Sequence, residues 1–126
     1  MEQKPSSEPF PPGFPPELAA QAFVHTGEAA WRPELATGAV KWLCELGYAV
    51  LGTEVLRPEP RGIQSLPYFQ SVDRNDNEDW MSFVTRAASE TIDYLKAFAG
   101  EFAKEGDVYI NVTWVTESEF HALKPR

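Results

Sequence analysis

Three patterns in the sequence together predict an α+β fold, in which a small antiparallel sheet is covered on one face by two main helices. The stretch Tyr48–Leu56 begins with four consecutive apolar residues and continues with β-branched ones, as a central strand does. Residues 107–115 alternate strictly between two faces, which is typical of a strand with one face on the core. In residues 78–99 the apolar side chains recur at intervals of three and four, which indicates an amphipathic helix.

The chain of 126 residues has the size of one domain. Six of its eleven prolines fall within residues 1–16, so we expect a disordered or extended tail there, followed by a single domain over residues 17–126. Proline suits the first position of a helix. A short helix is therefore expected from Pro16 to Val24, and Gly27 breaks it.

The first main helix is expected from Trp31 to about Leu46, because Pro33 suits a first turn and Gly47 suits a C-terminal cap. It leads into the strand Tyr48–Leu56. A turn rich in proline then joins this strand to a second one, over residues 63–72. Its Pro67 has no N–H to donate to a neighbouring strand, so this second strand is expected to be an edge strand or a broken one.

A polar loop over residues 73–79 precedes the second main helix, which is expected from about Glu78 to Ala99, with a continuation to Lys104 left open. Asn75 and Glu78 have the spacing of a capping box at its start. Trp80 should be buried against the strand Tyr48–Leu56. After the third strand, residues 116–119 also have the form of a capping box and predict a last short helical turn.

The order of these elements is helix, strand, strand, helix, strand. The hairpin makes the first two strands antiparallel, and a right-handed crossover over the first strand then places the third beside it. The predicted sheet order is therefore second, first, third, with every neighbouring pair antiparallel. Both helices cover one face, and the other face stays open.

The net charge of −8 comes from 19 acidic and 11 basic residues. This charge argues against nucleic acid as a partner, because binding has to neutralise phosphates, and it permits a partner with a basic surface. Keeping a small protein soluble explains the charge equally well. No apolar run is long enough to span a membrane, and a single cysteine with no signal sequence at Met1 leads us to expect a cytoplasmic protein.

Motifs for catalysis, metal binding or cofactor binding are missing from the sequence. Asp73, Asn75 and Asn77 begin like a calcium loop, but Glu78 stands where that loop needs glycine. Neither histidine has metal-ligand spacing to another histidine or to the cysteine, and the glycines do not form a phosphate-binding loop. We therefore expect no catalytic residue, no metal and no cofactor, which favours a binding protein over an enzyme.

The run from Gly47 to Val55, together with Trp31 and the helix that follows it, resembles bacterial immunity proteins of polymorphic toxin systems, in the family catalogued as immunity protein 40. The similarity extends over roughly residues 27–115 and includes Tyr68-Phe69, the sequence 77–80, Phe83-Val84 and Tyr94. Thr53 and Phe69 differ from the glycine and tryptophan expected there. The resemblance implies a small cytoplasmic protein that binds and neutralises a cognate toxin without enzyme activity.

Candidate partner-binding residues form two groups. One is the acidic loop, consisting of Asp73, Asp76, Glu78 and Asp79. The other is the open sheet face, where the candidates are Tyr48, Glu54, Tyr109, Asn111 and Thr113. Two other functions stay open, namely an adaptor or structural protein that dimerises through this face, and a small enzyme with a pocket between helix and sheet using Glu54 or Asp73. The sequence allows a monomer or a homodimer.

Overall fold

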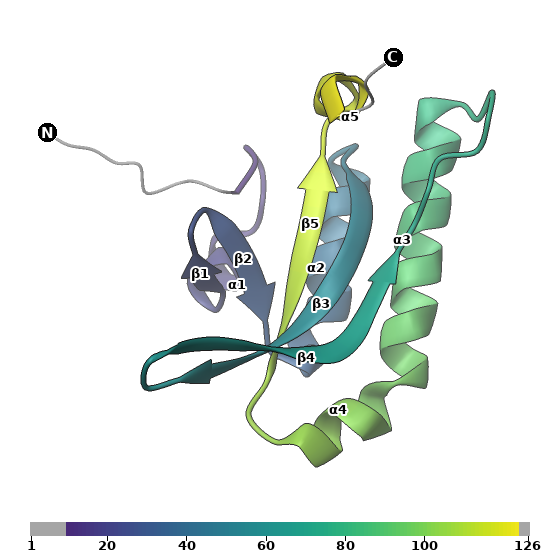
Figure 1. Cartoon of the computed structure of the whole chain (residues 1–126). Helices are drawn as coiled ribbons and strands as arrows, with labels where there is room; N and C mark the ends of the chain where they lie inside the picture. Colours follow the sequence, from purple (N-terminus) through teal and green to yellow (C-terminus); the bar gives the residue numbers. More distant parts are fainter. Residues whose placement is uncertain (1–9, 124–126) are drawn as a thin grey trace, which may run out of the picture.

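A five-stranded antiparallel sheet, in the order β1-β2-β5-β3-β4, forms one layer of the structure, and helices form the other (Figure 1). The computed structural model describes residues 10–123 of the chain. The strands are β1 (Phe23–His25), β2 (Glu28–Trp31), β3 (Ala49–Glu59), β4 (Gly62–Ser71) and β5 (Tyr109–Val115). The helices are α1 (Pro16–Ala20), α2 (Pro33–Glu45), α3 (Trp80–Ala97), α4 (Ala99–Glu105) and α5 (Glu117–Leu123). The predicted α+β class is therefore confirmed.

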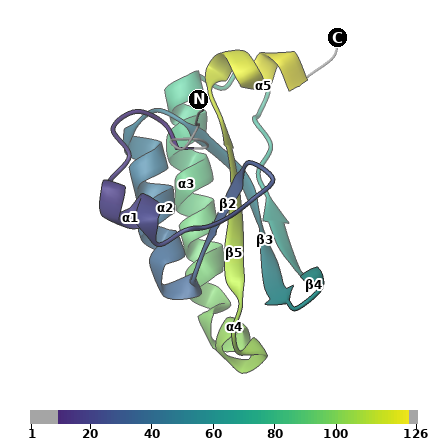
Figure 2. The same ribbon diagram turned by 90° about the vertical axis from the view of Figure 1, so that its left-hand side faces the viewer.

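The two long helices α2 and α3 lie together on one side of the sheet (Figure 2). Side chains of alternate residues on the central strands, such as Val55, Ile110 and Val112, point into this layer and are almost fully buried. On α2 the partners are Val40 and Leu43, both with no exposed surface. No helix of the described residues covers the opposite face of the central strands, as Figure 1 shows.

The three strands predicted from sequence are β3, β4 and β5. They keep the predicted relative order, since β3 lies between β4 and β5 and is antiparallel to both. β4, which contains Pro67, forms one edge of the sheet as expected. The complete sheet differs from the prediction, because β1 and β2 extend it beyond β5.

The hairpin of β1 and β2 was not expected from the sequence. Its turn consists of Thr26 and Gly27, which both have positive φ, 47° and 81°. This is the backbone that a two-residue hairpin requires, and a threonine there is an unusual choice. The helix predicted to reach Val24 therefore ends at Ala20, and Trp31 lies in a strand rather than at the start of α2.

Part of the predicted N-terminal tail is packed against the core. The rings of Phe10 and Phe14 lie 6.0 and 5.8 Å from the ring of Trp31, and Phe14 is only 7% exposed. The indole N–H of Trp31 donates to the carbonyl oxygen of Leu18 at 2.8 Å. The prediction of disorder is wrong for residues 10–16, because two phenylalanines among the prolines provide apolar surface to bury; residues 1–9 lie outside the described part.

The crossover helix α3 begins and ends within two residues of the predicted bounds, but its N-cap differs from the prediction. Asp79, rather than Asn75, is the N-cap of α3, and its carboxylate accepts a hydrogen bond from the Ser82 N–H at 3.1 Å. The chain bends at Phe98, so that α4 forms a separate short helix. Trp80 is half-buried rather than buried, and its indole N–H donates to the carbonyl oxygen of Gly47, just before β3, at 3.2 Å.

Candidate binding surface

A row of five residues crosses the open face of the sheet, one from each strand. Cross-strand pairing joins Phe23 to Ala30, Ala30 to Asn111, Asn111 to Glu54, and Glu54 to Phe69. Residues directly opposite each other in a sheet have side chains on the same face. The row therefore places an aromatic ring on each edge strand, with polar groups between them.

Phe69 is the most exposed large apolar side chain in the described part of the chain, with 76% of its surface accessible. Glu54 lies directly opposite it on β3, and its carboxylate has no hydrogen-bond or ion-pair partner among residues 10–123. Burial of an exposed phenylalanine under a partner stabilises the complex. An unpaired carboxylate offers a site for a basic group of the partner. The two together form a mixed apolar and acidic contact point.

The other sequence-predicted residues of this face are held in place by neighbours. Asn111 is 6% exposed, and its amide donates to Glu28 Oε1 at 3.1 Å. The ring of Tyr109 contacts Phe23 at 5.3 Å, with the Arg32 guanidinium 4.8 Å from its centroid. Because Asn111 and Tyr109 are already satisfied inside the fold, they shape the surface more than they offer free groups to a partner.

A hollow of about 390 Å³ lies beside the row. It is lined by Leu51, Gly52, Thr53, Glu54, Phe69, Gln70, Asn111 and Thr113. The hollow depends on Gly52, because a Cβ there would lie 2.3 Å from the backbone oxygen of Gln70 on β4. Phe69 of β4 and Thr113 of β5 line the same hollow from the two strands that flank β3. Glu54 lines the hollow but Asp73 does not, so these two carboxylates do not share a pocket.

Tyr48 does not belong to the open face, contrary to the prediction. It is half-buried and packs against the main core cluster. The reason is that β3 begins at Ala49, and a bulge between Val50 and Gly52 shifts the register of its first residues. Alternation counted from Tyr48 therefore does not carry through to Glu54.

The acidic loop, residues 73–79, is largely occupied by contacts within the fold. Glu78 forms an ion pair with Arg86, in which the Arg86 Nη2 and Nε atoms both lie 2.8 Å from its carboxylate oxygens. The Arg86 hydrogen bonds, with a further one from the Asn75 N–H, lower the pKa of Glu78 to about 2. Asp79 is the N-cap of α3. Two of the four predicted loop carboxylates are thus structural.

Asp73 and Asp76 keep exposed carboxylates without partners in the described part of the chain. They lie in the loop before α3, at the end of that helix farthest from α4 (Figure 1), whereas Glu54, Asn111 and Thr113 lie on the sheet. The structure therefore groups the predicted sheet residues together but leaves the acidic loop apart. The sequence analysis did not identify Phe69, Phe23 and Glu28 as residues of this face. Their side-chain directions depend on a register shift in β4 and on a hairpin that was not predicted.

Comparisons with known proteins assign no family to the chain. No family model matches it, and searches of curated proteins and of solved structures gave no match either. Within residues 10–123, no three His, Cys, Asp or Glu side chains are grouped so that they could hold a metal ion. In the same part of the chain, no helix combines the length and apolar character required to cross a membrane.

Proposed function

We propose that this protein is an immunity protein, which binds a toxin with a basic surface through the open face of its sheet and thereby neutralises it. The resemblance described above supports the class of function. The binding is stoichiometric and involves no catalysis. The partner contacts the row of Phe23, Asn111, Glu54 and Phe69, and the hollow beside it.

One observation carries this proposal, namely the pairing of Phe69 and Glu54 on the helix-free face. Phe69 is 76% exposed, and the carboxylate beside it has no partner in residues 10–123. Aromatic side chains that a partner covers are frequent energetic anchors of protein interfaces. A basic side chain of the toxin pairs with Glu54 while an apolar group covers Phe69.

The overall charge supports the same kind of partner. A net charge of −8 attracts a basic protein over several ångströms in solution and speeds the encounter. Asp73 and Asp76 add to this attraction from the end of α3, because neither carboxylate is neutralised locally. Long-range attraction acts on the association rate, and the contacts of the row act on the dissociation rate.

A toxicity assay tests the function. The candidate toxin is the product of the gene immediately upstream, and it is expressed in a sensitive bacterium with or without this chain. Wild-type chain should restore growth and should co-purify with that product. Failure of the wild-type chain to do either would refute the proposed function with this partner.

The location of the surface needs a separate comparison in the same assay. The double variant Glu54→Lys with Phe69→Ala should lose protection, because it reverses the charge and removes the exposed ring. Trp42→Ala is the matched control, since Trp42 is also an exposed aromatic residue, 44% accessible, but lies on α2. Protection by the double variant at the wild-type level would place the binding surface elsewhere.

A further inference from the structure

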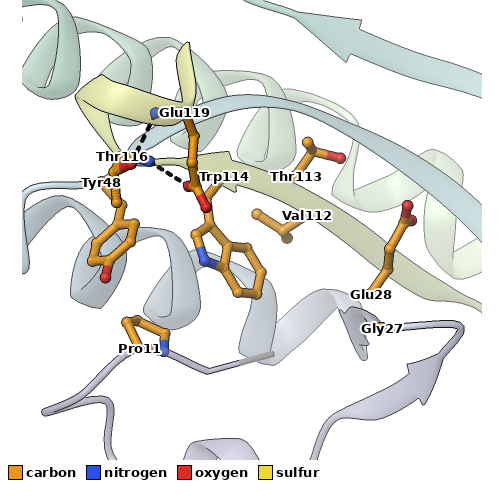
Figure 3. A pocket seen from close by; sticks show the side chains of 9 residues that line it. All are labelled: Pro11, Gly27, Glu28, Tyr48, Val112, Thr113, Trp114, Thr116 and Glu119. Carbon is orange, nitrogen blue, oxygen red and sulfur yellow. Dashed lines mark hydrogen bonds between the residues drawn. The ribbon is translucent and has the colours of Figure 1, made fainter. Parts of the chain in front are cut away.

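A pocket of about 330 Å³ opens where the end of β5 meets the N-terminal segment and α5 (Figure 3). It is lined by Pro11, Gly27, Glu28, Tyr48, Val112, Thr113, Trp114, Thr116 and Glu119. Figure 3 shows Trp114 near the centre, with Tyr48 and Pro11 to one side and Glu28 to the other. The pocket exists because pairing of β2 with β5 stops at Ala29 and Val112, while β5 continues to Val115.

The two carboxylates of the pocket are held by the backbone around them. Glu119 forms a reciprocal capping box with Thr116, in which Glu119 Oε1 accepts from the Thr116 N–H at 2.8 Å and Thr116 Oγ1 accepts from the Glu119 N–H at 3.1 Å. Glu28 follows the tight turn at Gly27, and its Oε1 accepts from the Asn111 amide at 3.1 Å. Their positions are therefore set before a ligand arrives.

The chemistry of the lining is that of a site for a cation. Two half-buried aromatic rings, Tyr48 and Trp114, present π-faces, and indole is the best side chain for attracting a cation. Glu28 and Glu119 each use one carboxylate oxygen in the hydrogen bonds just described, and neither forms an ion pair within residues 10–123. No Lys, Arg or His is among the described residues that line the pocket.

The size of the pocket and its neighbours indicate what enters it. Its volume lies near the lower end of the roughly 300–1,000 Å³ range of small-molecule sites, which suits one side chain rather than a cofactor. Thr113 lines both this pocket and the hollow beside Phe69, and Glu28 is bonded to Asn111 of the row. A partner on the open face is therefore within reach of the pocket.

We propose that this pocket binds the positively charged head of an arginine or lysine side chain that projects from the partner protein. The head lies against the Trp114 ring, and the negative charges of Glu28 and Glu119 around the pocket attract it. The identity of the occupant rests on the proposed function. The chemistry of the site is testable without the partner.

The test is a titration of the isolated chain with Nα-acetyl-arginine N-methylamide, followed through the indole N–H signal of Trp114 in NMR spectra. Trp114→Phe identifies that signal. The expected result is a saturable shift that weakens as salt is added. The analogue with citrulline, which has nearly the same shape but no charge, should leave the signal unchanged.

In a double variant, Glu28→Gln with Glu119→Gln, the remaining oxygen of each side chain can still accept from Asn111 or Thr116, but an uncharged amide NH2 replaces the free carboxylate oxygen. It should raise the apparent Kd for the arginine probe about tenfold, because both negative charges that attract the probe are lost. Glu34→Gln with Glu45→Gln is the matched control, since it removes the same charge from exposed positions at the two ends of α2.

No saturable shift in the wild-type chain, or an equal shift with the citrulline analogue, would overturn the pocket assignment. An equal loss of binding in both double variants would overturn it as well, since net charge would then be the cause. None of these outcomes affects the toxicity assay, so failure of the pocket and failure of the proposed function are distinguishable.

Discussion

At the scale of single residues, a glycine shapes the open face, and one carboxylate fixes the loop before α3. Gly52 lets β3 approach β4 closely, and this contact positions Phe69 opposite Glu54. Glu78 holds Arg86, whose Nη2 also donates to the carbonyl oxygen of Asp73 at 2.6 Å. The first residue sets the shape of the surface, and the second fixes the loop before α3.

Gly52→Ala should lower the free energy of unfolding by roughly 1–3 kcal/mol, because the new Cβ overlaps with the Gln70 carbonyl and β4 has to move. Urea unfolding followed by tryptophan fluorescence measures this. Gly38→Ala is the control, since a Cβ there meets nothing within 4 Å and the residue lies inside α2. That variant should gain about 0.5–1 kcal/mol. Equal stability of the two variants would contradict the close contact at Gly52.

Glu78 should make stability depend on pH in the acid range. Its pKa is lowered from the usual 4.5 to about 2 in the folded chain, so its contribution is complete above pH 4.5 and is lost as the pH falls towards 2. The melting temperature of Glu78→Gln should lie below that of wild type at neutral pH, and the gap should narrow over this window. Asp76→Asn, at an exposed position in the same loop, should have the same melting temperature as wild type over this pH range. A gap that stays constant down to pH 2 would exclude this role of the ion pair.

At the scale of elements, the long periodic segments were predictable and the short ones were not. α2, α3 and the strands β3, β4 and β5 follow from hydrophobic spacing, because each is long enough for the pattern to repeat; the shortest, β5, has seven residues. β1 and β2 contain only three and four residues, and their Thr26-Gly27 turn gives a weak signal. Composition misled the prediction at residues 10–16, where Phe10 and Phe14 cover Trp31.

The candidate surface was predictable to a similar extent. Alternation along β5 correctly groups Tyr109, Asn111 and Thr113 on one face, because side chains alternate with a period of two. The facing of Phe69 depends on the register shift of β4 between Glu54 and Leu56, which no sequence pattern marks. In the acidic loop, the sequence showed four carboxylates but not that Glu78 forms an ion pair with Arg86.

The N-terminal segment should contribute to stability as part of the fold. Phe14→Ala should cost about 3 kcal/mol, because it removes a ring that is 7% exposed and packs on the fully buried Trp31. Pro12→Ala changes an exposed neighbour in the same segment and should stay within about 0.5 kcal/mol of wild type. Chemical unfolding of both variants measures the difference. A cost for Phe14→Ala as small as that of Pro12→Ala would mean that this segment does not stabilise the core.

At the scale of the whole molecule, acidic charge and the open face have separate effects on binding. Asp73→Asn with Asp76→Asn should slow association with the toxin and flatten its salt dependence, while dissociation stays unchanged. Glu34→Gln with Glu45→Gln removes the same charge from α2, in the helix layer, and should slow association less. Stopped-flow mixing over a range of salt concentrations measures both. If the two pairs slow association equally, net charge acts as a whole and the loop has no special part.

The dissociation rate of the complex tests the central claim most directly, which is that the partner is held on the open face around Phe69 and Glu54. Phe69→Ala should speed dissociation at least about tenfold, because the loss of an aromatic anchor that the partner covers typically costs about 2 kcal/mol or more. Met81→Ala removes a similarly exposed apolar side chain, 51% accessible, from α3 and should dissociate at the wild-type rate. Wild-type dissociation of Phe69→Ala, together with faster dissociation of Met81→Ala, would contradict the claim and place the interface on the helices.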